Sequence, residues 1–160
     1  MKNRDLEKFR SEQAYRYFAH VREVVKKEHL MRDFIDEKRS LVGQLKGISY
    51  DSYITSSGYK SISDEMTRLI KDIEKYSIYL TEYVDEVRLC EKTLTQIKDK
   101  RLSNLLFLNF VMLKSWKKIA FEQETSISTI MKLRKKALLA AFEALPSEYR
   151  YKVPDARGDK

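Results

Sequence analysis

The most regular pattern of apolar positions lies in the middle of the chain. Apolar side chains recur there at alternating steps of three and four residues, with charged and polar side chains between them. The members of this seam are Met66, Leu69, Ile73, Tyr76, Leu80, Tyr83, Val87, Cys90, Leu94 and Ile97. Such steps place side chains on one stripe of an α-helix, and a run of this length is typical of a coiled coil. The pattern predicts a long helix over 64–98 whose seam packs against another helix.

A first helix is predicted upstream of this seam. Its apolar positions at helical spacing are Val21, Val24, Met31, Phe34, Leu41 and Leu45. Gly43 and Gly47 are predicted to end it after about 20 residues, with an extension toward the N-terminus. The first helix then covers the seam by folding back antiparallel, or two copies of the chain pair as a homodimer through 64–98.

The segment between the two helices is rich in Ser and Tyr. It is predicted as a loop over 47–62. Ser61 with Asp64 three residues later has the spacing of a capping box, which predicts the start of the second helix.

Composition agrees with an all-helical chain. The 160 residues include four Gly and two Pro, well below the ~12% expected of an average protein. That is too few turn residues for a β-sandwich or barrel. With 42% apolar and 35% charged residues, the chain is predicted to be all-α, a long helical hairpin or coiled coil followed by a smaller C-terminal domain.

After residue 99 the pattern changes to shorter units. The first is a strongly apolar helix with a break over 112–114; its apolar residues are Leu102, Leu105, Leu106, Leu108 and Phe110. Ser115 and Ser126 are predicted N-caps of two further helices, with a turn over 121–125 between them. The last helix is predicted to end at Leu145 because Pro146 follows. Its predicted apolar face is Ile130, Leu133, Ala137, Leu138, Ala141 and Leu145.

The same region carries the highest density of basic side chains. The whole chain has 32 basic and 24 acidic residues, a net charge of +8. Residues 114–136 hold seven basic and two acidic side chains, a net charge of +5. A short helix, a turn and a capped basic helix form the arrangement that places a recognition helix in the major groove of DNA. The candidate DNA-binding residues are Lys114, Lys117, Lys118, Ser126, Ser128, Thr129, Lys132, Lys135 and Lys136.

The motif S-W-K-K-I-A at 115–120, Ser126, Ile130 and R-K-K-A-L at 134–138 resemble the region-4 helix-turn-helix of sigma-70-type factors. This match covers 101–145. With the long heptad helix before it, the layout resembles phage-encoded late-gene transcription regulators of the RinA/ArpU type. The resemblance implies promoter-proximal DNA binding, contact with host RNA polymerase and a location in the host cell cytoplasm.

The turn departs from the sigma-like pattern. The family has an apolar residue, a Gly and a second apolar residue before the capping Ser, where this chain has Gln123, Glu124 and Thr125. Phe121 is expected to supply the missing core contact. No second segment resembles the part that recognises the −10 element, which favours an accessory activator over an independent sigma factor.

Signals of catalysis, metal binding and membrane insertion are absent from the sequence. His20 and His29 are nine residues apart, which is not the spacing of two metal ligands on one helix face. The glycines stand apart from one another, so there is no Gly-rich phosphate loop. Cys90 is predicted to pack as a small apolar residue. No cofactor and no enzyme activity are expected. The single cysteine and the charged N-terminal segment MKNRDLEKFR predict a cytoplasmic protein. The lack of ~18 uninterrupted apolar residues predicts that no segment spans a membrane.

Two functions remain open. The first is a transcription regulator that binds double-stranded DNA through 100–146, with the long helices of 1–99 as scaffold and 147–160 as a polar tail. The second is an oligomeric assembly or packaging protein, similar to a small terminase, in which DNA contact is loose. A monomer or dimer favours the first function and a ring of eight or more copies favours the second.

Overall fold

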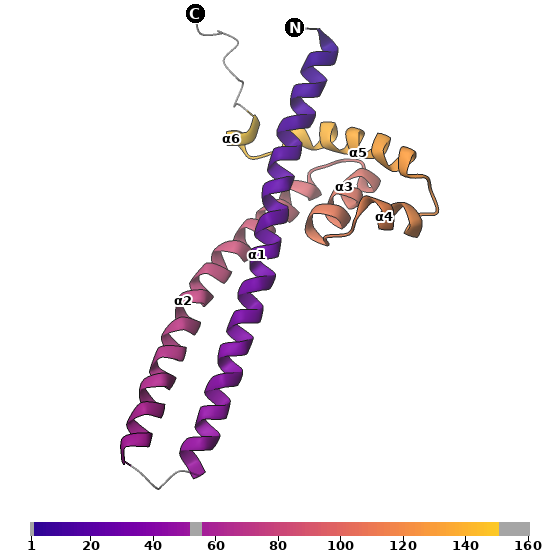
Figure 1. The fold of residues 1–160 in the computed structure, drawn as a ribbon. Helices are drawn as coiled ribbons and strands as arrows, with labels where there is room; N and C mark the ends of the chain where they lie inside the picture. Colours follow the sequence, from indigo (N-terminus) through magenta and orange to yellow (C-terminus); the bar gives the residue numbers. More distant parts are fainter. Residues whose placement is uncertain (1, 52–55, 151–160) are drawn as a thin grey trace, which may run out of the picture. The chain divides into compact units, whose positions relative to one another are not determined.

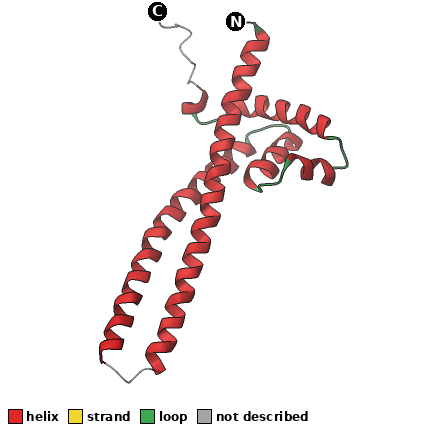
Figure 2. Ribbon diagram, viewed as in Figure 1, coloured by secondary structure: helices red, strands yellow, loops and turns green. Residues whose placement is uncertain are grey.

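The computed structural model describes residues 2–51 and 56–150, and every regular element in these ranges is a helix (Figures 1 and 2). Two long helices, α1 (Asn3–Asp51) and α2 (Ser56–Thr95), precede α3 (Lys100–Leu106) and the π-helix η1 (Phe107–Val111). Then follow α4 (Trp116–Glu122), α5 (Ile127–Ala141), the 3-10 helix η2 (Phe142–Ala144) and α6 (Ser147–Arg150). The all-α fold class is confirmed.

The chain forms two compact units, and both long helices run through both of them. One unit is Val25–Asp85, and the other combines Met1–Val24 with Glu86–Lys160. This division differs from the boundary expected near residue 99. The sequence pattern marks where helices begin and end, but it does not show which of them pack together over long distances along the chain.

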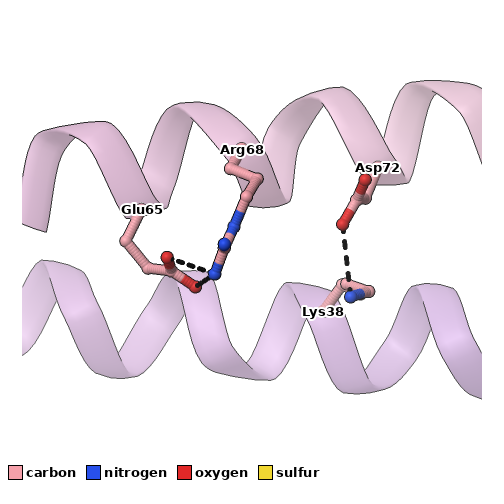
Figure 3. Close-up of polar contacts among 4 residues, drawn as sticks. All are labelled: Lys38, Glu65, Arg68 and Asp72. Carbon is pink, nitrogen blue, oxygen red and sulfur yellow. Dashed lines mark hydrogen bonds and ion pairs between the residues drawn. The ribbon is translucent and has the colours of Figure 1, made fainter.

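The unit Val25–Asp85 is an antiparallel hairpin of α1 and α2. Figure 3 shows the Lys38 ammonium of α1 beside the Asp72 carboxylate of α2, with 3.3 Å between Nζ and Oδ2. The rings of Phe34 and Tyr76 also meet across the two helices, with centroids 5.9 Å apart. Arg68, by contrast, pairs with Glu65 on its own helix. These contacts confirm the intrachain hairpin, the first of the two predicted arrangements for the seam.

The predicted seam is confirmed along α2, which carries nine of its residues; Ile97 follows the end of the helix. Each of its ten residues is buried or half-buried, while most polar side chains between them are exposed. The facing stripe of α1 differs from the prediction. Phe34 and Leu41 are 37% and 39% exposed, whereas Ile35 is buried and Val42 is half-buried. The predicted stripe combined residues from two neighbouring rows of side chains on the surface of α1. The row that faces α2 contains charged Glu28 and Lys38, so its sequence does not show it to be an apolar row.

The predicted end of the first helix and the predicted start of the second were wrong. α1 continues past Gly43 and Gly47 to Asp51, so it has 49 residues. A glycine inside a helix costs only about 1 kcal/mol relative to Ala, which packing of the hairpin offsets. α2 begins at Ser56, so Ser61 lies inside the helix and is not its N-cap. The predicted loop 47–62 is therefore largely helical, and its part 52–55 lies outside the described residues.

The second unit packs the first turns of α1 against the C-terminal helices. Phe18 of α1 and Phe110 of η1 are fully buried, and their ring centroids lie 5.3 Å apart. Burial of one such side chain contributes roughly 1.5–3 kcal/mol. The predicted polar tail begins with α6, and Tyr149 packs its ring 5.0 Å from the ring of Tyr17. Residues 151–160 lie outside the described part.

Candidate nucleic-acid interface

Helices α4 and α5 begin at the two serines that the sequence marks as N-caps. The Ser115 hydroxyl accepts a hydrogen bond of 3.1 Å from the backbone N–H of Lys118. The Ser126 hydroxyl accepts one of 3.1 Å from the N–H of Thr129. Each bond satisfies an N–H that has no partner within its helix. Both N-cap predictions are confirmed.

The turn between α4 and α5 has the hydrogen bonds of a Schellman motif. The N–H of Thr125 donates to the carbonyl of Ala120 at 3.0 Å, and the N–H of Glu124 donates to that of Phe121 at 3.2 Å. Glu124 adopts a left-handed backbone with φ of 51°. This is the position at which the sigma-like pattern has Gly, and Gly adopts that conformation without steric cost. Glu124 therefore adopts a backbone conformation that glycine favours, and this conformation destabilises the turn relative to one with glycine.

Phe121 does not fill the core as expected. Its side chain is 85% exposed, because it lies on the outer side of α4 beside Glu122. The core under the turn is built instead from the buried residues Leu105, Ile119, Ala120 and Ile130. Half-buried Trp116 packs against this cluster, so the prediction for Phe121 was wrong.

Helix α5 is held by the face that the sequence predicts. Ile130, Ala137, Leu138, Ala141 and Leu145 are buried and Leu133 is half-buried. The α-helix ends at Ala141, four residues earlier than predicted, and η2 leads to Leu145. Leu145 is extended, with ψ of 151°, as expected of a residue before proline.

Five of the predicted DNA-binding residues lie on the outer face of α5: Ser128, Thr129, Lys132, Lys135 and Lys136. All five are exposed. At 3.6 residues per turn they fall within an arc of about 120°, opposite the buried residues of the helix. The structure thus brings these side chains together on one surface, which holds three positive charges and two hydroxyl groups.

The other candidates lie near the start of α4 and α5. Lys117 and Lys118 are exposed on α4. Lys114, in the loop before α4, is half-buried and its Nζ lies 2.9 Å from Oε2 of Glu122. The hydrogen bond from Lys114 lowers the pKa of the Glu122 carboxyl, so this lysine is already paired with an anion. The hydroxyl of Ser126 is used as the N-cap.

Side chains of α1 contact this helical domain, and these contacts were not predicted from the sequence. The Arg22 guanidinium donates to Oδ1 of the buried Asn109, and its Cζ lies 4.5 Å from the Phe110 ring centroid. Nδ2 of Asn109 donates to the Lys114 carbonyl at 2.7 Å. Asn109 thus joins α1 to the loop that precedes α4. Asn109 interrupts the apolar run in the sequence, but its partner Arg22 is 87 residues away.

A second contact of this kind involves Arg134 of α5. Its guanidinium lies over the rings of Tyr15 and Trp116, with Cζ 5.1 and 5.7 Å from their centroids. Cation–π contacts of this kind contribute ~0.5–2 kcal/mol. Arg134 therefore anchors α5 to α1 and α4, whereas the neighbouring Lys135 and Lys136 extend outward.

The Cys90 thiol is buried, as predicted from its place in the seam. Burial raises the pKa of the Cys90 thiol to about 12, and burial likewise raises the pKa of the neighbouring Tyr17 hydroxyl. Both groups therefore stay neutral near pH 7. In the described ranges no three His, Cys, Asp or Glu side chains are grouped to hold a metal ion, and no helix is long and apolar enough to cross a membrane.

The arrangement can present a basic, hydroxyl-bearing helix surface to a polyanion. Comparisons with models of protein families, with curated proteins and with solved structures give no match to this chain.

Proposed function

We propose that this chain is a transcription regulator that binds double-stranded DNA with helix α5. The observation that carries the proposal is the outer face of α5, where exposed Lys132, Lys135 and Lys136 follow exposed Ser128 and Thr129 from a capped N-terminus. A recognition helix enters the major groove by its N-terminal turns. Ser128 and Thr129 then contact base edges, and the lysines contact phosphates.

Helix α4 supports the same orientation. Lys117 and Lys118 are exposed near its start, where a supporting helix of a helix-turn-helix crosses the DNA backbone. The resemblance of 115–138 to sigma region 4 favours action near a promoter, as a late-gene activator of a phage that contacts host RNA polymerase. Glu122 opposes this binding less than its charge suggests, because it is paired with Lys114.

The test is a charge reversal on the proposed reading face. Log affinity falls linearly with log salt, and the steepness of this fall, the salt slope, decreases by ~0.9 for each lost phosphate contact. The double variant Lys132→Glu with Lys135→Glu should therefore lower that slope by about 1.8 and weaken binding more than about tenfold near 0.1 M salt. Fluorescence anisotropy with a labelled duplex measures both quantities. Affinity within about twofold of wild type, with intact helix content, would show that this face does not bind DNA.

A matched control exists on the hairpin. Lys71 and Lys75 are exposed on α2, so Lys71→Glu with Lys75→Glu makes the same change of net charge far along the sequence from α5. The proposal predicts little loss of affinity for this control. An equal loss in both double variants would indicate attraction by overall charge alone.

An assembly function is favoured by a different observation. Several large apolar side chains of the hairpin are exposed, among them Leu30 at 48%, Ile48 at 51% and Ile78 at 63%. Exposed apolar side chains that form one continuous patch are typical of contact with another protein. Light scattering of the purified chain separates the two functions, because a ring of eight or more copies supports assembly and a monomer or dimer supports regulation.

A further inference from the structure

An open groove of about 650 Å³ lies between the first turns of α1 and helix α5. Its apolar lining is Tyr15 of α1 with Met131 and Leu138 of α5. Its α1 side carries Arg4 and Lys8 at a spacing of four residues, which places both on one stripe of the helix. The groove lies within one compact unit, since residues 1–24 and 86–160 belong together.

Lys135 belongs both to this groove and to the outer face of α5. It lines the groove together with Arg134, and it is exposed next to Lys132 and Lys136. A strand of DNA whose phosphates are held by Lys135 therefore passes the mouth of the groove. Across this mouth, the first turns of α1 carry Arg4 and Lys8 together with the carboxylates of Asp5 and Glu12.

The side chains around the groove have a net positive charge. Its lining includes four cations and two carboxylates, those of Asp5 and Glu12. The Arg134 guanidinium contacts the Tyr15 ring. Arg4 and Lys8 are both exposed, and neither forms an ion pair within the described residues. Long basic side chains of this kind neutralise phosphates and release their counterions.

We propose that Arg4 and Lys8 bind DNA phosphates next to the phosphate held by Lys135, so that the first turns of α1 are part of the DNA interface. This inference rests on the proposed function and adds a second segment to it. The α1 contacts carry no sequence information, because they reach phosphates and not base edges. They lengthen the bound stretch of DNA and set the orientation of α5 in the major groove of the DNA.

The first experiment removes the two charges without reversing them. The variant Arg4→Gln with Lys8→Gln keeps helix-forming side chains at exposed positions, so folding should be unchanged. Loss of two phosphate contacts should lower the salt slope by about 1.8 and the affinity near 0.1 M salt by about tenfold or more. The loss should be equal on a preferred fragment, meaning the DNA duplex that the protein binds most tightly, and on a duplex of random sequence. Lys71→Gln with Lys75→Gln on α2 is the matched control and should bind like wild type.

A second variant tests the same surface by a gain of affinity. Asp5→Asn with Glu12→Gln removes the two carboxylates of the groove, which repel a phosphate there. The proposal predicts binding at least about threefold tighter, from lost repulsion at partly exposed positions. Damage to the fold does not produce such a gain, so this result separates an electrostatic effect from a structural one.

The outcomes separate this inference from the proposed function. If Lys132→Glu with Lys135→Glu weakens binding but neither groove variant changes it, the contacts of α1 are wrong and DNA binding by α5 stands. If wild-type protein binds no duplex at ~0.1 M or at ~0.3 M salt, the proposed function and the inference both fail. A loss confined to the preferred fragment, with an unchanged salt slope, would also overturn the phosphate contacts of Arg4 and Lys8.

Discussion

The turn between α4 and α5 offers a direct test of its own backbone geometry through Glu124. Its φ of 51° is in the left-handed region, which costs a residue with a side chain roughly 1–2 kcal/mol. Glycine avoids this cost, but its greater freedom in the unfolded chain offsets roughly 0.5–1 kcal/mol. Glu124→Gly should therefore raise the free energy of unfolding by about 0.5–1 kcal/mol, or Tm by roughly 1–4 °C for a chain of this size.

Urea denaturation followed by circular dichroism measures this change. The control is Glu82→Gly, an exposed position inside α2, where glycine should lower the stability by about 1 kcal/mol. Glu124→Gln separates charge from conformation, because it removes the carboxylate and keeps the strained backbone. The reasoning is refuted if Glu124→Gly destabilises the protein as much as the control does, since the turn then lacks the left-handed residue.

Three further predictions concern single side chains. Ser126→Ala should lower the free energy of unfolding by about 1 kcal/mol through loss of the N-cap. The control Ser128→Ala, on the exposed face of the same helix, should change the free energy of unfolding little. Thermal denaturation of the two variants measures the difference. Asn109→Leu should cost about 1–3 kcal/mol in urea denaturation, because it leaves the Lys114 carbonyl and the Arg22 guanidinium without this partner. A cost below that of an average surface change would contradict the network. In the folded protein, Cys90 should react slowly with a thiol reagent at pH 8, because burial raises its pKa to about 12 and keeps the thiol protonated. After unfolding it should react quickly. Fast labelling of the folded chain would contradict the burial of Cys90.

Local signals in the sequence predicted much of the C-terminal domain. The N-caps at Ser115 and Ser126 follow from hydrogen bonds to residues three positions away, so the motif contains all the information needed. The apolar stripe of α5 was predicted for the same reason. The conformation of Glu124 could not be read from its residue type, because a glutamate gives no sign of a left-handed backbone.

Features that depend on distant partners were not predictable. Phe121 is apolar, yet its place on the outer side of α4 leaves it exposed, and Trp116 and Ile119 fill the core. The stop signals at Gly43 and Gly47 failed because packing along the hairpin outweighs the small cost of glycine in a helix. The contacts of Arg22 and Arg134 with other helices join residues far apart in the chain, so no periodicity in the sequence reveals them.

The central claim is that α5 reads duplex DNA, and a competition experiment tests it most directly. Purified protein is titrated against labelled duplexes from its own genomic neighbourhood and against a randomised pool, at ~0.1 and ~0.3 M salt, with excess unlabelled random duplex. The account predicts tight binding to one fragment that survives the competitor and is lost in Lys132→Glu with Lys135→Glu. Weak binding that is equal on every duplex and abolished by the higher salt would contradict it, because the basic face of α5 would then be a surface without sequence preference.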